Sequence, residues 1–251
     1  VRNMINIVIP MAGAGSRFAK AGYKNPKPFI DVLGKPMICH VLDNLNIPDA
    51  KFILLTRFEH YNNEQETVKW IKSNYKVEFV MIDKLTEGAA CTVLHAHRLV
   101  NNDTPLLIAN SDQIVDMDIS EYINDSKKRG LDGSVLCFED NDKKWSYAKL
   151  DKNRFITEIR EKEVISKNAT VGIYYFNKGR DFVENAIDMI VRNERVNNEF
   201  YVAPVYNYAI NQGKKFGIYT IGKTQMHGTG TPEDLDKYIE TVKEQQGALV
   251  L

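Results

Sequence analysis

The sequence predicts an α/β protein with a Rossmann-like, three-layer α/β/α fold around a mixed, mostly parallel central sheet. Short, uninterrupted apolar runs recur along the first half of the chain, as expected of strands that are buried on both faces. Helix-like segments separate these runs, which is the pattern of parallel strands joined by helical crossovers. Beyond residue 112, two short strand-like segments flank a tight turn and indicate an antiparallel addition to the sheet.

The elements justify this fold in chain order. Buried strands are predicted over residues 5–11, 51–56, 77–83 and 105–112, and helices between them over 34–45, 61–74 and 88–100. The second half predicts a helix over 118–129, a strand over 133–138, a hairpin of 146–151 with 154–159, and a strand over 169–176. Helices over 178–192 and 201–212, a strand over 215–222 and a helix from about residue 232 complete the chain. No repeat or flexible linker interrupts it, so we expect one domain over residues 1–251.

The composition argues against several classes of partner. Lys and Arg number 33 and balance 33 Asp and Glu, so the chain has no net charge with which to attract a nucleic acid or an anionic membrane. No apolar run approaches the ~20 residues of a membrane span. The first ten residues do not resemble a signal peptide, and three scattered cysteines indicate buried thiols, so we expect a cytoplasmic protein. The sequence leaves homo-oligomerisation open.

The loop after the first strand predicts a phosphate site. Gly13 and Gly15, with Ala12 and Ala14 between and before them, allow backbone N–H groups to face an anion. Arg17 and the proline-flanked Lys27 add two cations that can stabilise charge on a reacting phosphate. A dinucleotide site is disfavoured because Phe18 stands where a third glycine is needed, and a P-loop is disfavoured because no Gly-Lys-Ser/Thr follows.

The composite of GAGSR, NPKPF and LGKP resembles the sugar-phosphate nucleotidyltransferase family, and the resemblance runs from residue 5 to about 238. It implies a nucleotide-binding half over about 1–115 and an acceptor-binding half over about 116–251. It also implies that the enzyme transfers a nucleoside monophosphate from an NTP to a phosphorylated small molecule and releases pyrophosphate. Arg17, Lys27 and Asp112 would then be the catalytic residues, with Ala12–Gly15 around the nucleotide.

Asp112 ends an apolar strand and resembles the family's Mg²⁺ ligand, and a single carboxylate with phosphate oxygens suits that ion. The family's second carboxylate, in a Trp-x-Asp-x-Gly-Thr motif, is missing here, because Met226 replaces the Trp and Gly228 replaces the Asp. The resemblance also places Gly88 against the base. Asp83 stands where relatives often carry Gln, and because a carboxylate accepts but does not donate, it favours the amino group of cytosine and hence CTP. A turn residue at the end of the strand is the alternative interpretation of Asp83.

The acceptor half is less faithful to the family. Glu161 and Lys162 remain from a Glu-Lys-Pro motif, and Gly172 remains from Gly-Ile-Tyr. Tyr147 is followed by Ala148 where the family often has glycine, and Glu199 lies in a segment like the family's acceptor-binding Glu. These five residues, Tyr147, Glu161, Lys162, Gly172 and Glu199, are the predicted acceptor site.

Within the family, the likeness favours the cytidylyltransferases of capsule phosphoramidate synthesis. It implies CTP plus L-glutamine phosphate giving CDP-L-glutamine, in the supply of capsule or surface polysaccharide precursors. A uridylyl-, thymidylyl- or cytidylyltransferase for a sugar 1-phosphate is the alternative. A non-catalytic nucleotide-binding module is a third reading, which the absence of a carboxylate at Gly228 suggests.

Overall fold

The apolar runs of the first half form four parallel strands in the computed structural model, which describes residues 4–249. β1 (Ile5–Met11) lies between β4 (Ala50–Arg57) and β6 (Leu106–Ala109), and β5 (Val77–Ile82) pairs with the far edge of β4. Strands buried on both faces need apolar residues at every position, and β6 is buried throughout. The carboxyl ends of these strands therefore meet at one edge of the sheet.

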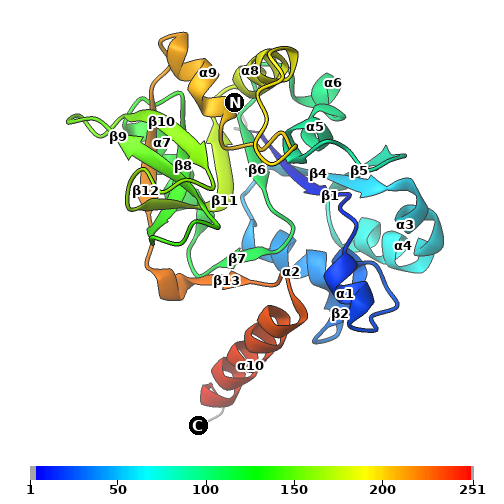
Figure 1. The fold of residues 1–251 in the computed structure, drawn as a ribbon. Helices are drawn as coiled ribbons and strands as arrows, with labels where there is room; N and C mark the ends of the chain where they lie inside the picture. The colour runs from blue at the N-terminus through cyan, green and yellow to red at the C-terminus, as the bar shows by residue number, and fades with distance from the viewer. Residues whose placement is uncertain (1–3, 250–251) are drawn as a thin grey trace.

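The second half extends the same sheet through β11 (Asn168–Phe176), which runs antiparallel to β6. β11 also pairs with β8 (Gly133–Glu139) and β9 (Ser146–Leu150), β9 forms a hairpin with β10 (Ile156–Glu161), and β12 (Phe216–Thr220) runs parallel to β8. The result is a nine-stranded sheet with the order β10-β9-β11-β6-β1-β4-β5 and β8-β12 branching from β11. This mixed sheet confirms the predicted fold class (Figure 1).

Helices cover both faces of the sheet because the strand residues alternate between two apolar layers. Ile7 and Ile9 belong to one buried cluster, and Val8 belongs to the other. The first cluster includes residues of α2 (Met37–Asn44), α4 (Gln65–Asn74) and α7 (Ile119–Lys128). The second includes residues of α5 (Ala89–Leu94), α8 (Gly179–Val191) and α9 (Val205–Asn211). The three predicted layers are therefore present.

Several predicted helices were too long. The helix expected over 61–74 is two helices, α3 (Phe58–Asn63) and α4, because the backbone breaks at Glu64. The helix expected over 88–100 is α5 followed by α6 (His97–Val100). The helix expected from residue 34 begins at Met37, because 31–36 form a small hairpin of β2 (Asp31–Val32) and β3 (Lys35–Pro36). The helix expected from 201 begins only after Pro204.

A two-stranded ribbon that the sequence did not predict holds the C-terminal segment beside the strand ends. β7 (Gln113–Val115) pairs with β13 (Met226–Gly228), and Gly228 lies opposite Gln113. After β13 the chain enters α10 (Pro232–Ala248), whose Leu235 packs against Phe18 of α1 (Ser16–Lys20). In Figure 1, α10 extends away from the sheet. No helix within residues 4–249 is long and apolar enough to cross a membrane.

Candidate active site

The glycine-rich loop leaves the carboxyl end of β1 and turns directly into α1. Gly15 is the residue before that helix and has a φ of 59°, a conformation that favours glycine. A Cβ at this position would lie 3.6 Å from the Cβ of Lys27. The loop and the segment that carries Lys27 are therefore packed against each other, as a shared phosphate site requires.

Lys27 and Asp112, which are 85 positions apart in the sequence, form an ion pair at the carboxyl ends of the strands. The Lys27 Nζ atom donates to Asp112 Oδ2 over 2.6 Å. Lys27 opens a short 3₁₀ turn (Lys27–Phe29) between Pro26 and the buried Pro28, which restricts its backbone. The two side chains are 19% and 28% exposed, so the pair is partly screened from water and still open to a ligand.

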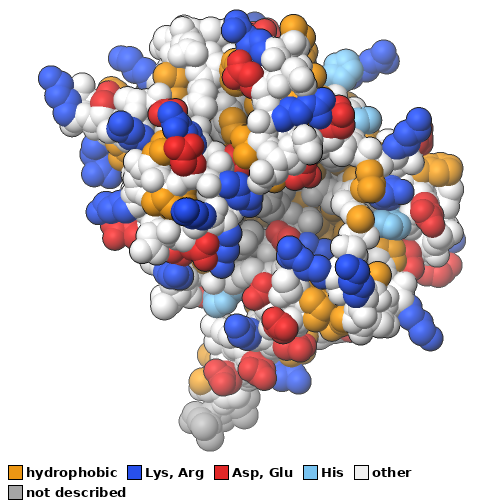
Figure 2. Space-filling model, in the orientation of Figure 1, with side chains coloured by type: hydrophobic (Ala, Val, Ile, Leu, Met, Phe, Trp, Pro, Cys, Tyr) orange, Lys and Arg blue, Asp and Glu red, His pale blue; other side chains and the backbone are white. Residues whose placement is uncertain are grey.

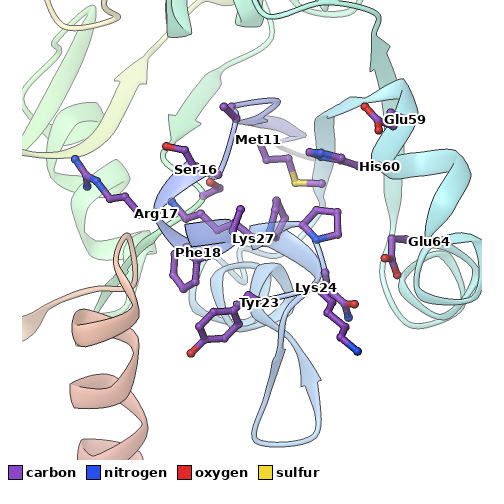
Figure 3. A pocket seen from close by; sticks show the side chains of 18 of the residues that line it. Met11, Ser16, Arg17, Phe18, Tyr23, Lys24, Lys27, Glu59, His60 and Glu64 are labelled. Atoms are coloured by element: carbon purple, nitrogen blue, oxygen red, sulfur yellow. The ribbon is translucent and has the colours of Figure 1, made fainter. Parts of the chain in front are cut away.

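A cavity of about 740 Å³, which we call the loop cavity, lies over this loop. Gly13, Ala14, Gly15, Arg17 and Lys27 all line it. Figure 3 shows Lys27 in the middle of this cavity, with Arg17 and Ser16 on one side and His60 of α3 across from them. Burial and the nearby Arg57 guanidinium lower the pKa of His60, which keeps that ring neutral near pH 7. The cationic charge of the cavity therefore comes from Arg17, Lys24 and Lys27, of which Lys27 is paired with Asp112.

A second cavity of about 470 Å³, the strand-end cavity, adjoins the first. The two cavities share Pro10, Gly13, Ala14 and Ser111 in their walls. The strand-end cavity is also lined by Ala12, Gly88, Asp112 and Glu199. Figure 2 shows this face of the molecule hollowed near its centre, with Lys and Arg side chains on the rim. Eight of the nine predicted nucleotide and catalytic residues thus converge on two connected spaces.

Gly88 allows the backbone of the acceptor half, at Phe200, to pack against the wall of the strand-end cavity. Its φ is 129°, and a Cβ there would lie 2.5 Å from the carbonyl oxygen of Phe200. The Ala90 N–H donates to that same carbonyl over 3.0 Å, and the Phe200 N–H donates to the Glu87 carbonyl over 2.8 Å. This backbone contact brings Glu199, the residue before Phe200, to the wall of the strand-end cavity.

Asp83 is the exception among the nucleotide residues. It follows β5 directly and is exposed, and neither the loop cavity nor the strand-end cavity includes it among its lining residues. The hydroxyls of Thr86 and Thr92 line the strand-end cavity instead and lie 2.6 Å from each other. Asp83 therefore remains a predicted base-reading residue that stands outside the cavity in this structure.

The predicted acceptor residues divide into a polar group and two buried positions. The Glu161 side chain is 8% exposed, burial raises the pKa of its carboxyl, and Lys162 Nζ lies 3.7 Å away. Lys162 donates to the Lys144 carbonyl over 2.7 Å. Glu199 accepts a hydrogen bond from the Tyr201 hydroxyl over 2.8 Å. Burial is the main cause of the raised pKa of Glu161, and the charge of Glu199 adds to it. Glu161 itself lines a separate cavity beside α8 and α9.

Tyr147 and Gly172 have structural roles that their motifs did not reveal. The Tyr147 side chain is fully buried in the core, and its hydroxyl donates to the Asp142 carbonyl over 2.7 Å, which leaves no surface for a ligand. A Cβ at Gly172 would lie 2.3 Å from the Asn110 side chain, so this glycine makes room for Asn110 of the strand-end cavity. Neither Tyr147 nor Gly172 lines the loop cavity, the strand-end cavity or the cavity beside α8 and α9.

The residues around Asp112 fit Mg²⁺ as an ion held mainly by a substrate. The Lys27 ammonium already lies on Asp112 Oδ2, which shows that the carboxylate accepts a cation. Among residues 4–249, no group of three or more His, Cys, Asp and Glu side chains is placed to hold a metal. Magnesium commonly takes one or two carboxylates, with phosphate oxygens and water completing its octahedron. Asp112 is thus the carboxylate at this site that would hold the ion.

Sequence reasoning missed several residues that line the cavities. Asn110 and Ser111 follow β6, and both reach the strand-end cavity. Their signal was present, because polar residues after a buried parallel strand lie at the ligand-binding edge of such a sheet. His60 in the loop cavity gave no comparable signal, because α3 was expected to begin three residues later.

Comparison with known sequences gives this geometry a context. The family model described as Nucleotidyl transferase matches residues 7–245. The bifunctional protein GlmU of Methanococcus vannielii is 27% identical over 222 residues, which cover 85% of this chain and 50% of that protein. The mannose-1-phosphate guanylyltransferase catalytic subunit beta of Drosophila melanogaster is 24% identical over 182 residues, which cover 70% of this chain and 49% of its own. The chain thus spans about half the length of the curated relatives it matches.

Solved structures share the fold over nearly the whole chain. The nucleoside-diphosphate-sugar pyrophosphorylase of Vibrio cholerae RC9 superposes with a TM-score of 0.79 at 25% identity, covering 93% of this chain and 99% of that one. A UDP-glucose pyrophosphorylase in complex with UDP-glucose superposes with a TM-score of 0.76 at 17% identity, covering 96% and 99%. The second likeness concerns the fold alone.

Proposed function

Because the chain belongs to the nucleotidyl transferase family, we propose that it transfers a nucleoside monophosphate from an NTP to a phosphorylated small molecule. The observation that carries this proposal is the Lys27–Asp112 pair, 2.6 Å apart at the edge of two adjoining cavities that the glycine-rich loop lines. A cation and a metal-binding carboxylate beside a phosphate loop are the parts that phosphoryl chemistry needs. A purely nucleotide-binding module needs no such pair.

In the proposed reaction, a phosphate oxygen of the acceptor attacks the α-phosphorus of the NTP. A new P–O bond forms, the bond between the α-phosphorus and the bridging oxygen breaks, and pyrophosphate leaves. The attacking phosphate is already anionic at neutral pH, so no general base is required. Lys27 and Arg17, with the N–H groups of the glycine-rich loop, stabilise charge on the reacting phosphates. A bound Mg²⁺ would supply electrostatic stabilisation of the same phosphates, with Asp112 as its protein ligand.

We propose CTP as the favoured nucleotide and L-glutamine phosphate as the acceptor, giving CDP-L-glutamine in the cytoplasm for capsule or surface polysaccharide synthesis. This finer proposal is supported by the sequence resemblance to cytidylyltransferases of that pathway and by the departures of the acceptor half from the sugar-binding pattern. These departures are Ala148, where the family often has glycine, and Glu163, which stands in place of the proline of the Glu-Lys-Pro motif.

A second candidate is a sugar-1-phosphate nucleotidyltransferase. The names of two similar proteins favour it, because they specify mannose 1-phosphate and nucleoside-diphosphate sugars for those proteins. Glu161 and Glu199 also suit sugar hydroxyls, since a carboxylate accepts hydrogen bonds from hydroxyl and ammonium groups alike.

A substrate panel tests both candidates. CTP, UTP, dTTP, GTP and ATP are each incubated with L-glutamine phosphate or a sugar 1-phosphate, and pyrophosphate release and product mass are measured. Pyrophosphate released only with CTP and L-glutamine phosphate supports the finer proposal. Release with sugar 1-phosphates alone supports the second candidate. No release with any pair, despite measurable NTP binding, contradicts both and identifies a nucleotide-binding module.

A further inference from the structure

We propose that Lys27 and Asp112 form an exchangeable ion pair, so that the free chain holds no divalent cation at Asp112 and accepts one only together with a nucleotide. The inference rests on the proposed nucleotidyl transfer for the identity of the arriving anion. It adds an obligatory coupling between metal and nucleotide to that function. It also gives a consequence of having glycine at position 228, where no side chain supplies a second carboxylate for the cation.

The first argument is that Asp112 already has a cation. Lys27 Nζ lies 2.6 Å from Asp112 Oδ2, and both side chains are largely shielded from solvent. Pro26 and the buried Pro28 hold the backbone of Lys27 close by, so little conformational entropy is lost when the pair forms. A divalent cation that approaches Asp112 alone meets the positive charge of this ammonium and must displace it. Displacement without a new anion would leave Lys27 partly buried and unpaired.

The second argument is that the carboxylates described near Asp112 have partners of their own. Glu199, which lines the strand-end cavity with Asp112, accepts a hydrogen bond from the Tyr201 hydroxyl over 2.8 Å. Gly228 lies opposite Gln113 in the β7–β13 ribbon, and a Cβ there would meet only Gln113 Nε2, at 3.8 Å. Gly230, two residues later, approaches Asp112 itself, since a Cβ there would lie 3.0 Å from Asp112 Oδ2. The nearby Asp116 is occupied by His227, whose Nε2 is 2.7 Å away. Alone, Asp112 is a weak site for an ion that prefers several oxygen ligands.

A triphosphate on the glycine-rich loop removes both obstacles together. Its oxygens provide the further ligands that the cation needs, and they offer Lys27 an anion in place of Asp112. Lys27 and Asp112 then change partners, and no charge remains unpaired. Because each ligand improves the site for the other, the affinities for metal and nucleotide are coupled and the coupling is reciprocal. The Lys27 ammonium pairs with Asp112 in the free chain and with the reacting phosphate once the nucleotide is bound.

The experiment measures binding of Mn²⁺, a paramagnetic substitute for Mg²⁺, to the purified chain without nucleotide, by the loss of the free-ion EPR signal. Lys27→Met removes the competing cation, and Gly228→Asp adds a second carboxylate in open space. Each is expected to tighten Mn²⁺ binding about tenfold relative to wild type, the change typical of one charged partner. Asp112→Asn in either background should erase the gain. Circular dichroism checks that each variant is folded.

Adding the α,β-methylene analogue of CTP should tighten Mn²⁺ binding to wild type by more than it does to Gly228→Asp, because the variant no longer depends on phosphate ligands. The proposal is overturned if wild type without nucleotide binds Mn²⁺ as tightly as Gly228→Asp, or if Lys27→Met leaves the Mn²⁺ affinity unchanged. Pyrophosphate release is assayed separately. A chain that shows the predicted Mn²⁺ affinities but releases no pyrophosphate with any substrate pair contradicts the proposed function and leaves the ion-pair exchange standing.

Discussion

The two halves of the molecule differ in how far their predicted residues converge. In the nucleotide half, residues from the loop after β1, the turn after β5 and the end of β6 line two adjoining cavities. Of the five predicted acceptor residues, only Glu199 lines either of those cavities, Glu161 lines another one, and Tyr147 is buried in the core. Loops at the ends of neighbouring parallel strands bring short sequence motifs together, so such a site can be predicted from those motifs. A site on the antiparallel strands β8 to β11 depends on packing between distant segments, which short motifs do not reveal.

The largest expected effect tests the centre of the nucleotide half. Asp112→Asn should lower the turnover number about 10³-fold, near the upper end of losses for one preorganised electrostatic group. The amide keeps the shape of the carboxylate, so the fold should survive while the affinity for Mg²⁺ is lost. Turnover is measured against Mg²⁺ concentration at saturating substrates. Asp116→Asn is the matched control, because Asp116 pairs with His227, and it should stay close to wild type. An unchanged Mg²⁺ dependence in Asp112→Asn would place the metal elsewhere.

The next effect separates catalysis from nucleotide binding in the same half. Lys27→Ala should lower the turnover number on the order of 10²-fold and weaken NTP binding much less, because the ammonium acts on charge that develops during the reaction. Single-turnover kinetics give the chemical step, and calorimetry gives NTP affinity. Lys20→Ala, an exposed cation at the end of α1, serves as the control and should have little effect. Turnover near that of wild type in Lys27→Ala would remove this residue from the mechanism.

A smaller effect tests whether Glu161 of the acceptor half contributes to binding of the acceptor. Glu161→Gln should raise the KM for the acceptor about tenfold, the loss of one charged hydrogen bond, and leave the KM for the NTP unchanged. Glu158→Gln, on a carboxylate of the same strand that pairs with Arg160 and does not line the cavity of Glu161, is the control. A rise in the NTP KM of Glu161→Gln would mean that the two halves are not separate in function.

The same carboxyl predicts a pH dependence. Burial raises the pKa of Glu161, so it becomes protonated at a higher pH than an ordinary glutamate. Acceptor affinity that needs the anion should therefore fall as pH decreases through this raised pKa, and the fall should be absent in Glu161→Gln. The KM for the acceptor is measured across the acidic range in both proteins. If acceptor affinity falls with the same midpoint pH in wild type and in Glu161→Gln, the titrating group is not Glu161.

The contrast between the halves also explains what the sequence could predict. The fold class and the alternation of strands and helices in the first half followed from apolar periodicity, and the choice of Lys27 and Asp112 as site residues followed from the family's motifs and from residue types at strand ends. Their contact with each other was not predicted. The β7–β13 ribbon did not follow, because its strands have only three residues each and join segments more than 100 positions apart. The burial of Tyr147 did not follow either, because alternation along β9 gives two faces and no motif says which face meets the ligand.

The smallest expected effect concerns base choice, at the boundary between the two halves. Asp83 is exposed just after β5 and does not line the strand-end cavity, so water would screen any mismatch between its carboxylate and a base. A carboxylate that accepts from the amino group of cytosine would face the O4 acceptor of uracil, at a cost of ~1 kcal/mol at such a site. Wild type should then prefer CTP to UTP about 5-fold in kcat/KM, and Asp83→Asn, which adds a donor, should narrow that ratio by improving UTP. Asp103→Asn, an exposed aspartate that pairs with Arg180, is the control. The Thr86 hydroxyl offers a second way to recognise the base, because Thr86 lines the strand-end cavity beside Thr92. If Asp83→Asn leaves the CTP-to-UTP ratio unchanged while Thr86→Val alters it, the base is recognised by Thr86 and not by Asp83.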